Sequence, residues 1–171
     1  MATLDYTGKS VDAGRIGAAV EHLVAASCVL ASNAELNVST SLVDDEGVDL
    51  VFHRRGSSTT VAVQVKARSS DTSVVERGSY TAFVRTATFR PRPELFMLFV
   101  VVDRPTATIR DVWWVPSVDF DLRAGTTNRA TRRFVASVKA GANDQWRAYR
   151  MPFADLPAAI LRQIDQLAGA R

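Results

Sequence analysis

Two short stretches of the chain, Asp45-Glu46-Gly47-Val48-Asp49-Leu50-Val51 and Val63-Gln64-Val65-Lys66, decide how it folds. Both are rich in β-branched and apolar residues, and a polar loop at residues 53–59 separates them, so they are predicted to be neighbouring strands of a hairpin. Asp49 lies inside an apolar run, and Lys66 ends one. Because burying an unpaired charge costs free energy, such side chains usually face a partner, a metal ion or a hydrated cleft.

These two strands predict a site for phosphate chemistry. In a hairpin with this loop length, Asp49 lies across from residues 64–66 on one face, so that a carboxylate, the amide of Gln64 and the ammonium of Lys66 converge. Carboxylate and amide oxygens are the hard ligands that Mg²⁺ prefers. A lysine beside them can position a water molecule or stabilise charge that develops on a phosphate.

Working outward from this hairpin, the sequence predicts an α/β fold. Apolar residues at helical spacing predict helices at residues 12–34 and 155–167, and residues 117–122 are predicted to form a short helix. Strands are predicted at residues 36–43, 48–52, 60–67, 80–85, 94–102, 111–115, 132–139 and 146–151. The run at 94–102 is apolar throughout and is expected to be a central strand, whereas 132–139 is expected at an edge. Residues 44–47 are predicted as a turn, and 68–79 as a polar loop.

Length and composition exclude several classes of protein. With 171 residues, 47% of them apolar and 23% charged, the chain fits one globular domain over residues 1–171 and excludes a disordered or collagen-like protein. The lone Cys28 excludes an internal disulfide and a cysteine-based zinc cluster. The longest apolar run, Leu95–Val102, is too short to cross a membrane, and Met1–Ser10 has no signal pattern. A cytoplasmic protein without a membrane partner is expected.

Charge is distributed unevenly along the chain. Residues 1–75 hold 6 basic and 9 acidic residues, and residues 76–171 hold 15 basic and 9 acidic residues. An acidic half that carries carboxylates and a basic half suit a protein that acts on a polyanion. A basic group near the C-terminus either forms an ordinary solvated face or, if it shares a side with Lys66, contacts nucleic acid. Its candidate contact residues are Arg129, Arg132, Arg133 and Lys139.

Three motifs, in this order, resemble the PD-(D/E)XK nuclease superfamily and in particular its Mrr-type and Holliday-junction-resolvase branches. Gly17-x-x-x-Glu21-x-x-Val24 resembles the first helix of that branch, Asp45-x-Gly47-Val48-Asp49 its aspartate strand, and Gln64-Val65-Lys66 its (Glu/Gln)-x-Lys strand. The resemblance covers residues 12–68. Less specifically, Leu95–Val102 followed by residues 113–117 is similar to the later strands of some uncharacterised members.

The resemblance implies a restriction-endonuclease-like three-layer core, in which helices flank a central mixed sheet. It implies hydrolysis of DNA phosphodiester bonds with Mg²⁺ or Mn²⁺ as cofactor. Matched position by position, Asp49 corresponds to the main metal ligand and Gln64 to a second ligand. Asp45 is the alternative ligand. Lys66 becomes the catalytic lysine, and Glu21 an outer ligand or a base that orients water. The resemblance implies DNA as the partner. It leaves open whether the protein forms a homodimer.

Other interpretations of these residues stay open. Gln64 stands where an acid is commoner, and a neutral amide binds Mg²⁺ more weakly than a carboxylate because it supplies no charge. The second hypothesis is therefore a catalytically inactive member of the same fold that binds nucleic acid or another protein. Taken singly, Lys66 is also typical of a strand end that reaches water. Glu21 is also typical of the margin of a helix's apolar face, and Asp49 of an acid that flanks a turn.

Overall fold

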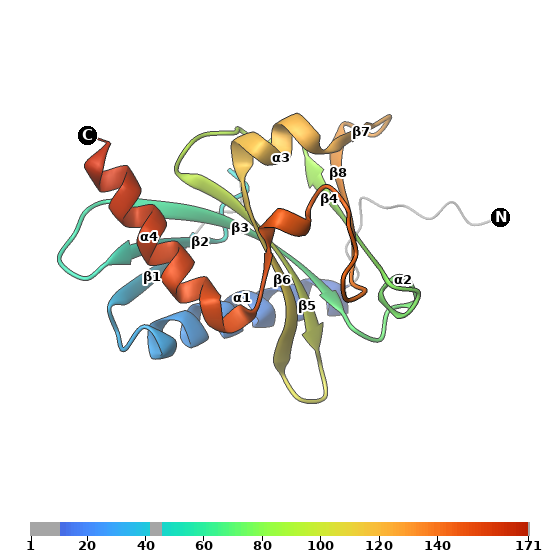
Figure 1. Ribbon diagram of the computed structural model, residues 1–171, viewed down its shortest axis with the longest axis horizontal. Helices are drawn as coiled ribbons and strands as arrows, with labels where there is room; N and C mark the ends of the chain where they lie inside the picture. Colours follow the sequence, from blue (N-terminus) through green and yellow to red (C-terminus); the bar gives the residue numbers. More distant parts are fainter. Residues whose placement is uncertain (1–10, 42–45, 171) are drawn as a thin grey trace.

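The computed structural model describes residues 11–41 and 46–170 and contains two β-sheets (Figure 1). The helices are α1 (Val11–Ala31), α2 (Ser73–Glu76), α3 (Ser117–Arg123) and α4 (Leu156–Gly169), with 3₁₀ turns at Arg147–Tyr149 and Phe153–Asp155. The strands are β1 (Leu36–Thr40), β2 (Leu50–Arg54), β3 (Thr60–Ser69), β4 (Ser79–Arg85), β5 (Leu95–Asp103), β6 (Thr108–Pro116), β7 (Gly125–Thr127), β8 (Thr131–Ser137) and β9 (Arg150–Met151).

The larger sheet is mixed and has the order β1-β2-β3-β5-β6-β9. Strands β3 and β5 pair in parallel, from Ala62 opposite Leu95 to Ser69 opposite Val102, whereas the other neighbours are antiparallel. All of β5 except its last residue is buried. The prediction of a central strand buried on both faces is therefore confirmed. Burial of both faces accounts for its uninterrupted apolar run.

Different layers cover the two faces of this sheet. On one face, Val61, Val63 and Val65 of β3 pack in a core with apolar residues of α1 and α4. On the opposite face, Ala62 and the alternate residues of β5 pack in a second core against α3 and the smaller sheet. The predicted α/β class with a mixed central sheet is confirmed, but the second flanking layer is largely a sheet, with α3 beside it (Figure 1).

The smaller sheet has the order β4-β8-β7. It packs on the larger sheet through aromatic rings, and the rings of Phe134 and Phe99 stack with their centroids 3.8 Å apart. The prediction that residues 132–139 form an edge strand is wrong, because β8 lies between β4 and β7. The cause is Gly125–Thr127, a three-residue strand with no apolar side chain and hence no strand pattern in the sequence.

Several predicted boundaries also change. The first helix ends at Ala31 because Asn33 and Ala34 take left-handed conformations with φ of 53° and 59°. The predicted loop at 68–79 contains α2, and the predicted strand at 146–151 is mostly a 3₁₀ turn that leads into β9. Residues 44 and 45 of the predicted turn lie outside the described residues.

Helix α1 is apolar along most of its length. By length and composition alone, residues 12–31 could cross a membrane, with a mean hydropathy of 1.3. In this fold, α1 instead contributes Val20, Val24 and Cys28 to the core beneath the larger sheet. Burial raises the pKa of the Cys28 thiol to about 12, so the thiol is neutral at physiological pH and serves as an apolar packing group.

Candidate functional site

Asp49 lies where the pairing of β2 and β3 ends. The last paired residues are Leu50 and Val63, and beyond them the backbone N–H of Asp49 donates to the carbonyl of Val63 at 2.9 Å. The Asp49 carboxylate then accepts a hydrogen bond from the backbone N–H of Val65, with Oδ2 at 2.6 Å. A side chain thus takes the place of a backbone carbonyl and holds the carboxylate against the stretch that contains Gln64 and Lys66.

Gln64 is a buried polar residue on the face of β3 that looks toward the smaller sheet. Its side-chain amide lies over Gly47, where a Cβ atom would come within 2.9 Å of Nε2. Gly47 also has φ of +66°, a conformation that favours glycine. The backbone conformation therefore favours glycine in the motif Asp45-x-Gly47-Val48-Asp49, and a larger residue there would also displace the amide of Gln64.

Lys66 follows Gln64 on the same face of β3 and is half-buried. Its backbone carbonyl accepts a hydrogen bond of 2.5 Å from the hydroxyl of Tyr80, which is fully buried in β4. Burial raises the pKa of Tyr80, so its hydroxyl stays protonated and remains a donor. The smaller sheet thereby fixes the backbone that carries Lys66.

Glu21 lies on the side of α1 that faces the larger sheet. At 100° per residue it is only about 20° from Cys28, about 40° from Ala25 and about 60° from Val24, all three of which are buried. Glu21 itself is half-buried. The sequence placed it at the margin of the apolar face, but the buried Ala25 and Cys28 put it in the middle of the sheet-facing stripe.

Helix and strand lengths bring Glu21 toward the end of the sheet that holds Asp49. Glu21 precedes the end of α1 by ten residues, about 15 Å, and β1 extends about 13 Å from Leu36 to Thr40. Thr40 pairs with Leu50, the neighbour of Asp49. Glu21 nevertheless belongs to the helical layer, whereas Gln64 and Lys66 face the smaller sheet.

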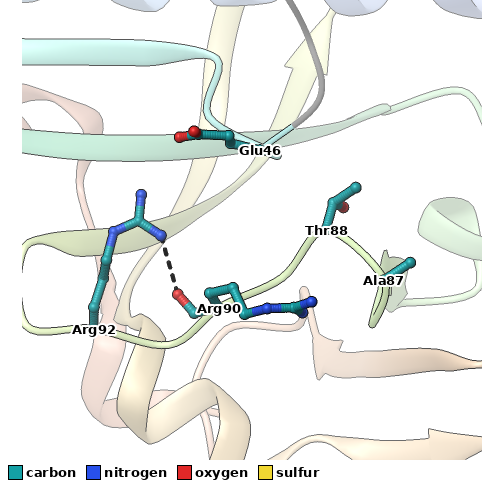
Figure 2. Close-up of a pocket in the computed structure, with 5 residues that line it drawn as sticks. All are labelled: Glu46, Ala87, Thr88, Arg90 and Arg92. Atoms are coloured by element: carbon teal, nitrogen blue, oxygen red, sulfur yellow. Dashed lines mark hydrogen bonds between the residues drawn. The ribbon is translucent and has the colours of Figure 1, made fainter.

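An open cavity of about 320 Å³ borders this group and is lined by Glu46, Ala87, Thr88, Arg90 and Arg92 (Figure 2). Its connection to Gln64 runs through Gly47, because a Cβ atom at Gly47 would also lie 3.5 Å from Oγ1 of Thr88. Figure 2 shows the guanidinium group of Arg92 donating a hydrogen bond to the backbone carbonyl of Arg90, and Arg92 also forms an ion pair of 3.4 Å with Glu94. The two arginines share this cavity with the carboxylate of Glu46, and nearby carbonyl groups already accept hydrogen bonds from both guanidinium groups.

The segment between β4 and β5 that carries these arginines is firmly held. The buried hydroxyl of Ser117 accepts from the backbone N–H of Arg92 at 2.9 Å and donates to the carbonyl of Arg92 at 2.8 Å. The guanidinium group of Arg90 donates to the carbonyls of Thr86 and Phe89. Neither arginine was among the predicted site residues, although their alternation with Pro91 and Pro93 was a usable signal.

The four candidate nucleic-acid contacts have different surroundings. Arg133 is exposed on β8, and Arg129 is exposed in the turn between β7 and β8. Arg132 points to the other side of β8, where it forms an ion pair of 2.5 Å with Asp121 of α3. Lys139 follows β8, and its aliphatic carbons cover Gly78.

The donor set matches Mg²⁺ better than a transition metal. Within residues 11–41 and 46–170, no three His, Cys, Asp or Glu side chains gather as a metal cluster would, and Asp45 lies outside the described residues. Mg²⁺ needs no such cluster, because it keeps several water ligands and is commonly held by one or two carboxylates together with substrate phosphates. The carboxylate of Asp49 and the amide oxygen of Gln64 are hard donors of this kind.

Comparison with known proteins supports the fold. No family model and no curated protein sequence matches the chain. A solved structure of a bacterial homing endonuclease, I-Ssp6803I, aligns with 93% of this chain and 99% of that chain, with a TM-score of 0.53 and 16% sequence identity. At this identity the likeness concerns the fold, and the chain therefore has an architecture that a nuclease also has.

Proposed function

We propose that this protein is a metal-dependent endonuclease of the PD-(D/E)XK type that hydrolyses phosphodiester bonds in DNA. The observation that carries the proposal is the contact between Asp49 and the N–H of Val65, which holds a carboxylate beside Gln64 and Lys66 at the end of a strand pair. The resemblance of the three sequence motifs and the shared architecture with a homing endonuclease support it independently.

In this proposal, Asp49 and Gln64 hold Mg²⁺ or Mn²⁺. The bound ion would polarise the scissile phosphate and lower the pKa of the attacking water. Lys66 stabilises the negative charge that develops on the phosphate. Glu21 lies in the helical layer on the other face of the sheet, so we assign it no step in the reaction. Arg90 and Arg92 hold a phosphate of the strand in the cavity beside Gly47.

The test is cleavage of linear, nicked and branched DNA by the purified protein with Mg²⁺ or Mn²⁺. Asp49→Asn keeps an oxygen that can accept from Val65 but removes the charge, so we expect cleavage to fall on the order of 100-fold with the fold intact. Lys66→Ala should have a similar effect. Asp155→Asn is the matched control, because Asp155 is exposed at the start of α4 and makes no capping hydrogen bond.

Metal binding has its own measurement, which is the melting temperature with and without Mn²⁺. An ion that binds only the folded state raises the melting temperature of the wild type, and Asp49→Asn should abolish that shift. The proposal is wrong if the wild type cuts no DNA, or if Asp49→Asn cuts as fast as the wild type.

A second candidate function is a catalytically inactive module that binds nucleic acid or protein through the same fold. The neutral amide of Gln64, in a position where a carboxylate would bind metal more tightly, favours it. It predicts DNA binding that is sensitive to salt and indifferent to Mn²⁺, together with a melting temperature that Mn²⁺ does not raise.

A further inference from the structure

The outer face of the smaller sheet combines exposed apolar residues with arginines. Strand residues alternate between two sides, and Tyr80, Ala82, Val84, Phe134 and Ala136 point into the core. The opposite side of β4 and β8 presents Phe83, which is 44% exposed, and Val135, which is 39% exposed, together with the exposed Arg85 and Arg133. Of the residues that the structure describes, Phe83 is the one large aromatic side chain left exposed.

Register places these side chains in adjacent positions. Phe83 is opposite Arg133, Thr81 is opposite Val135, and Arg85 is opposite Thr131. On its other side Arg133 faces Gly125 of β7, which has no side chain to cover it. Arg133 therefore has the exposed ring of Phe83 on one side and no side chain on the other.

No carboxylate belongs to the segments that build this sheet. Residues 77–93 contain four arginines, residues 122–143 contain four arginines and one lysine, and neither segment contains an Asp or Glu. The acids that border the second segment are occupied: Asp121 pairs with Arg132, and Asp144 accepts from the backbone N–H groups of Ser137 and Trp146. Such a surface has charge complementarity to a polyanion.

We propose that the outer face of β4 and β8 docks in the major groove of duplex DNA, an inference that rests on the proposed action on DNA. A two-stranded ribbon fits that groove, and β4 and β8 pair over seven residues, which corresponds to about 23 Å of ribbon. Arg85 and Arg133 contact the phosphates, while Phe83 and Val135 face the base edges, where the thymine methyl group offers apolar contact. The chain continues from Arg85 directly into the segment that carries Arg90 and Arg92.

The surface fits a duplex better than a single strand. Proteins that hold single strands stack successive bases on several aromatic side chains, but this face has one exposed aromatic residue. Its arginines are spread over a ribbon that is wider than one strand. Arg132 provides an internal contrast, because it is adjacent to Arg133 in sequence but projects from the other side of β8 toward Asp121.

The experiment is fluorescence anisotropy of the full chain with a labelled 30-base-pair duplex and with a 30-nucleotide single strand, in EDTA and over a range of salt concentrations. For the double variant Arg85→Ala/Arg133→Ala we expect at least tenfold weaker duplex binding. We also expect the slope of log K against log salt to be smaller by roughly one for each arginine. Arg162→Ala, which removes the same charge from the exposed side of α4, should leave the slope unchanged.

Three results would overturn the docking proposal. They are duplex binding by the double variant equal to that of the wild type, an absence of duplex binding, and tighter binding of the single strand with Phe83→Ala as the most damaging change. Because EDTA removes the metal, duplex binding is measured separately from cleavage. A failure of docking can thus be distinguished from a failure of the nuclease proposal, which is judged by cleavage.

Discussion

The two sheets of this protein differ in where they place charge. The larger sheet has apolar faces, and its chemistry-bearing residues Asp49, Gln64 and Lys66 gather where the pairing of β2 and β3 ends. The smaller sheet has an aromatic inner face and an outer face with arginines and no carboxylate. Under the proposals made above, the larger sheet would hold the reacting groups and the smaller sheet would hold the polyanion.

The contact between the sheets gives the largest expected effect. Phe134 of the smaller sheet stacks on Phe99 of the larger sheet and also lies against Tyr80, Trp113 and Trp146. Phe134→Ala would leave a cavity in this aromatic cluster, so we expect the free energy of unfolding to fall by about 3–5 kcal/mol in urea denaturation. Loss of this contact should also weaken duplex binding, because the outer face depends on the position of the sheet.

Phe83→Ala is the matched control for this prediction. Phe83 occupies the outer face of the same sheet, and its removal should change the free energy of unfolding by only about 0.5 kcal/mol. Equal losses from the two phenylalanines would contradict the assignment of an inner and an outer face.

The difference between the sheets also explains what the sequence could predict. Strands β2, β3 and β5 contain β-branched and apolar runs whose period is visible locally, and the polar residues that interrupt them stand out. The alternation of Val61, Val63 and Val65 with Ala62, Gln64 and Lys66 followed from the pleat alone. The position of Asp49 across from residues 64–66 could therefore be predicted from the residues, whereas the mixed sheet was an implication of the resemblance.

The smaller sheet could not be predicted in the same way. Its strands β4 and β8 are separated by more than forty residues of sequence, and β7 has no apolar residue, so no local period reveals their pairing. The cavity beside Gly47 depends on the contact between Thr88 and Gly47, which is also non-local. The orientation of Glu21 depends on Ala25 and Cys28, which are small residues that sequence patterns weight lightly.

Gln64→Glu tests whether Gln64 of the larger sheet binds the metal ion. A carboxylate in place of the amide adds a negative charge to the donor set, and metal affinity rises with ligand charge. We expect the Mn²⁺ concentration that produces half of the thermal shift to fall about tenfold. Gln166→Glu, on the exposed side of α4, adds the same charge elsewhere and should leave that concentration unchanged. If both variants shift it equally, Gln64 is not a ligand.

Tyr80→Phe gives the smallest effect and tests how the smaller sheet supports the site. The change keeps the ring and removes only the hydroxyl that donates to the carbonyl of Lys66. We expect a loss of about 1 kcal/mol in the free energy of unfolding and a several-fold decrease in cleavage, with the Mn²⁺ shift retained. Tyr149→Phe removes a hydroxyl that donates instead to Asp119, so it should reduce stability without reducing cleavage.

Tyr80 also predicts a dependence on pH with a definite sign. Burial raises its pKa above the value of an exposed tyrosine, so the hydroxyl is protonated and donates to Lys66 throughout the neutral range. The stabilisation is therefore complete below the pKa of the unfolded chain, near 10, and is lost as the pH rises toward the folded value. The difference in stability between the wild type and Tyr80→Phe should accordingly shrink above pH 10. A difference that stays constant from pH 7 to beyond pH 10 would mean that folding does not raise the pKa of Tyr80, which would contradict the burial of its hydroxyl between the two sheets.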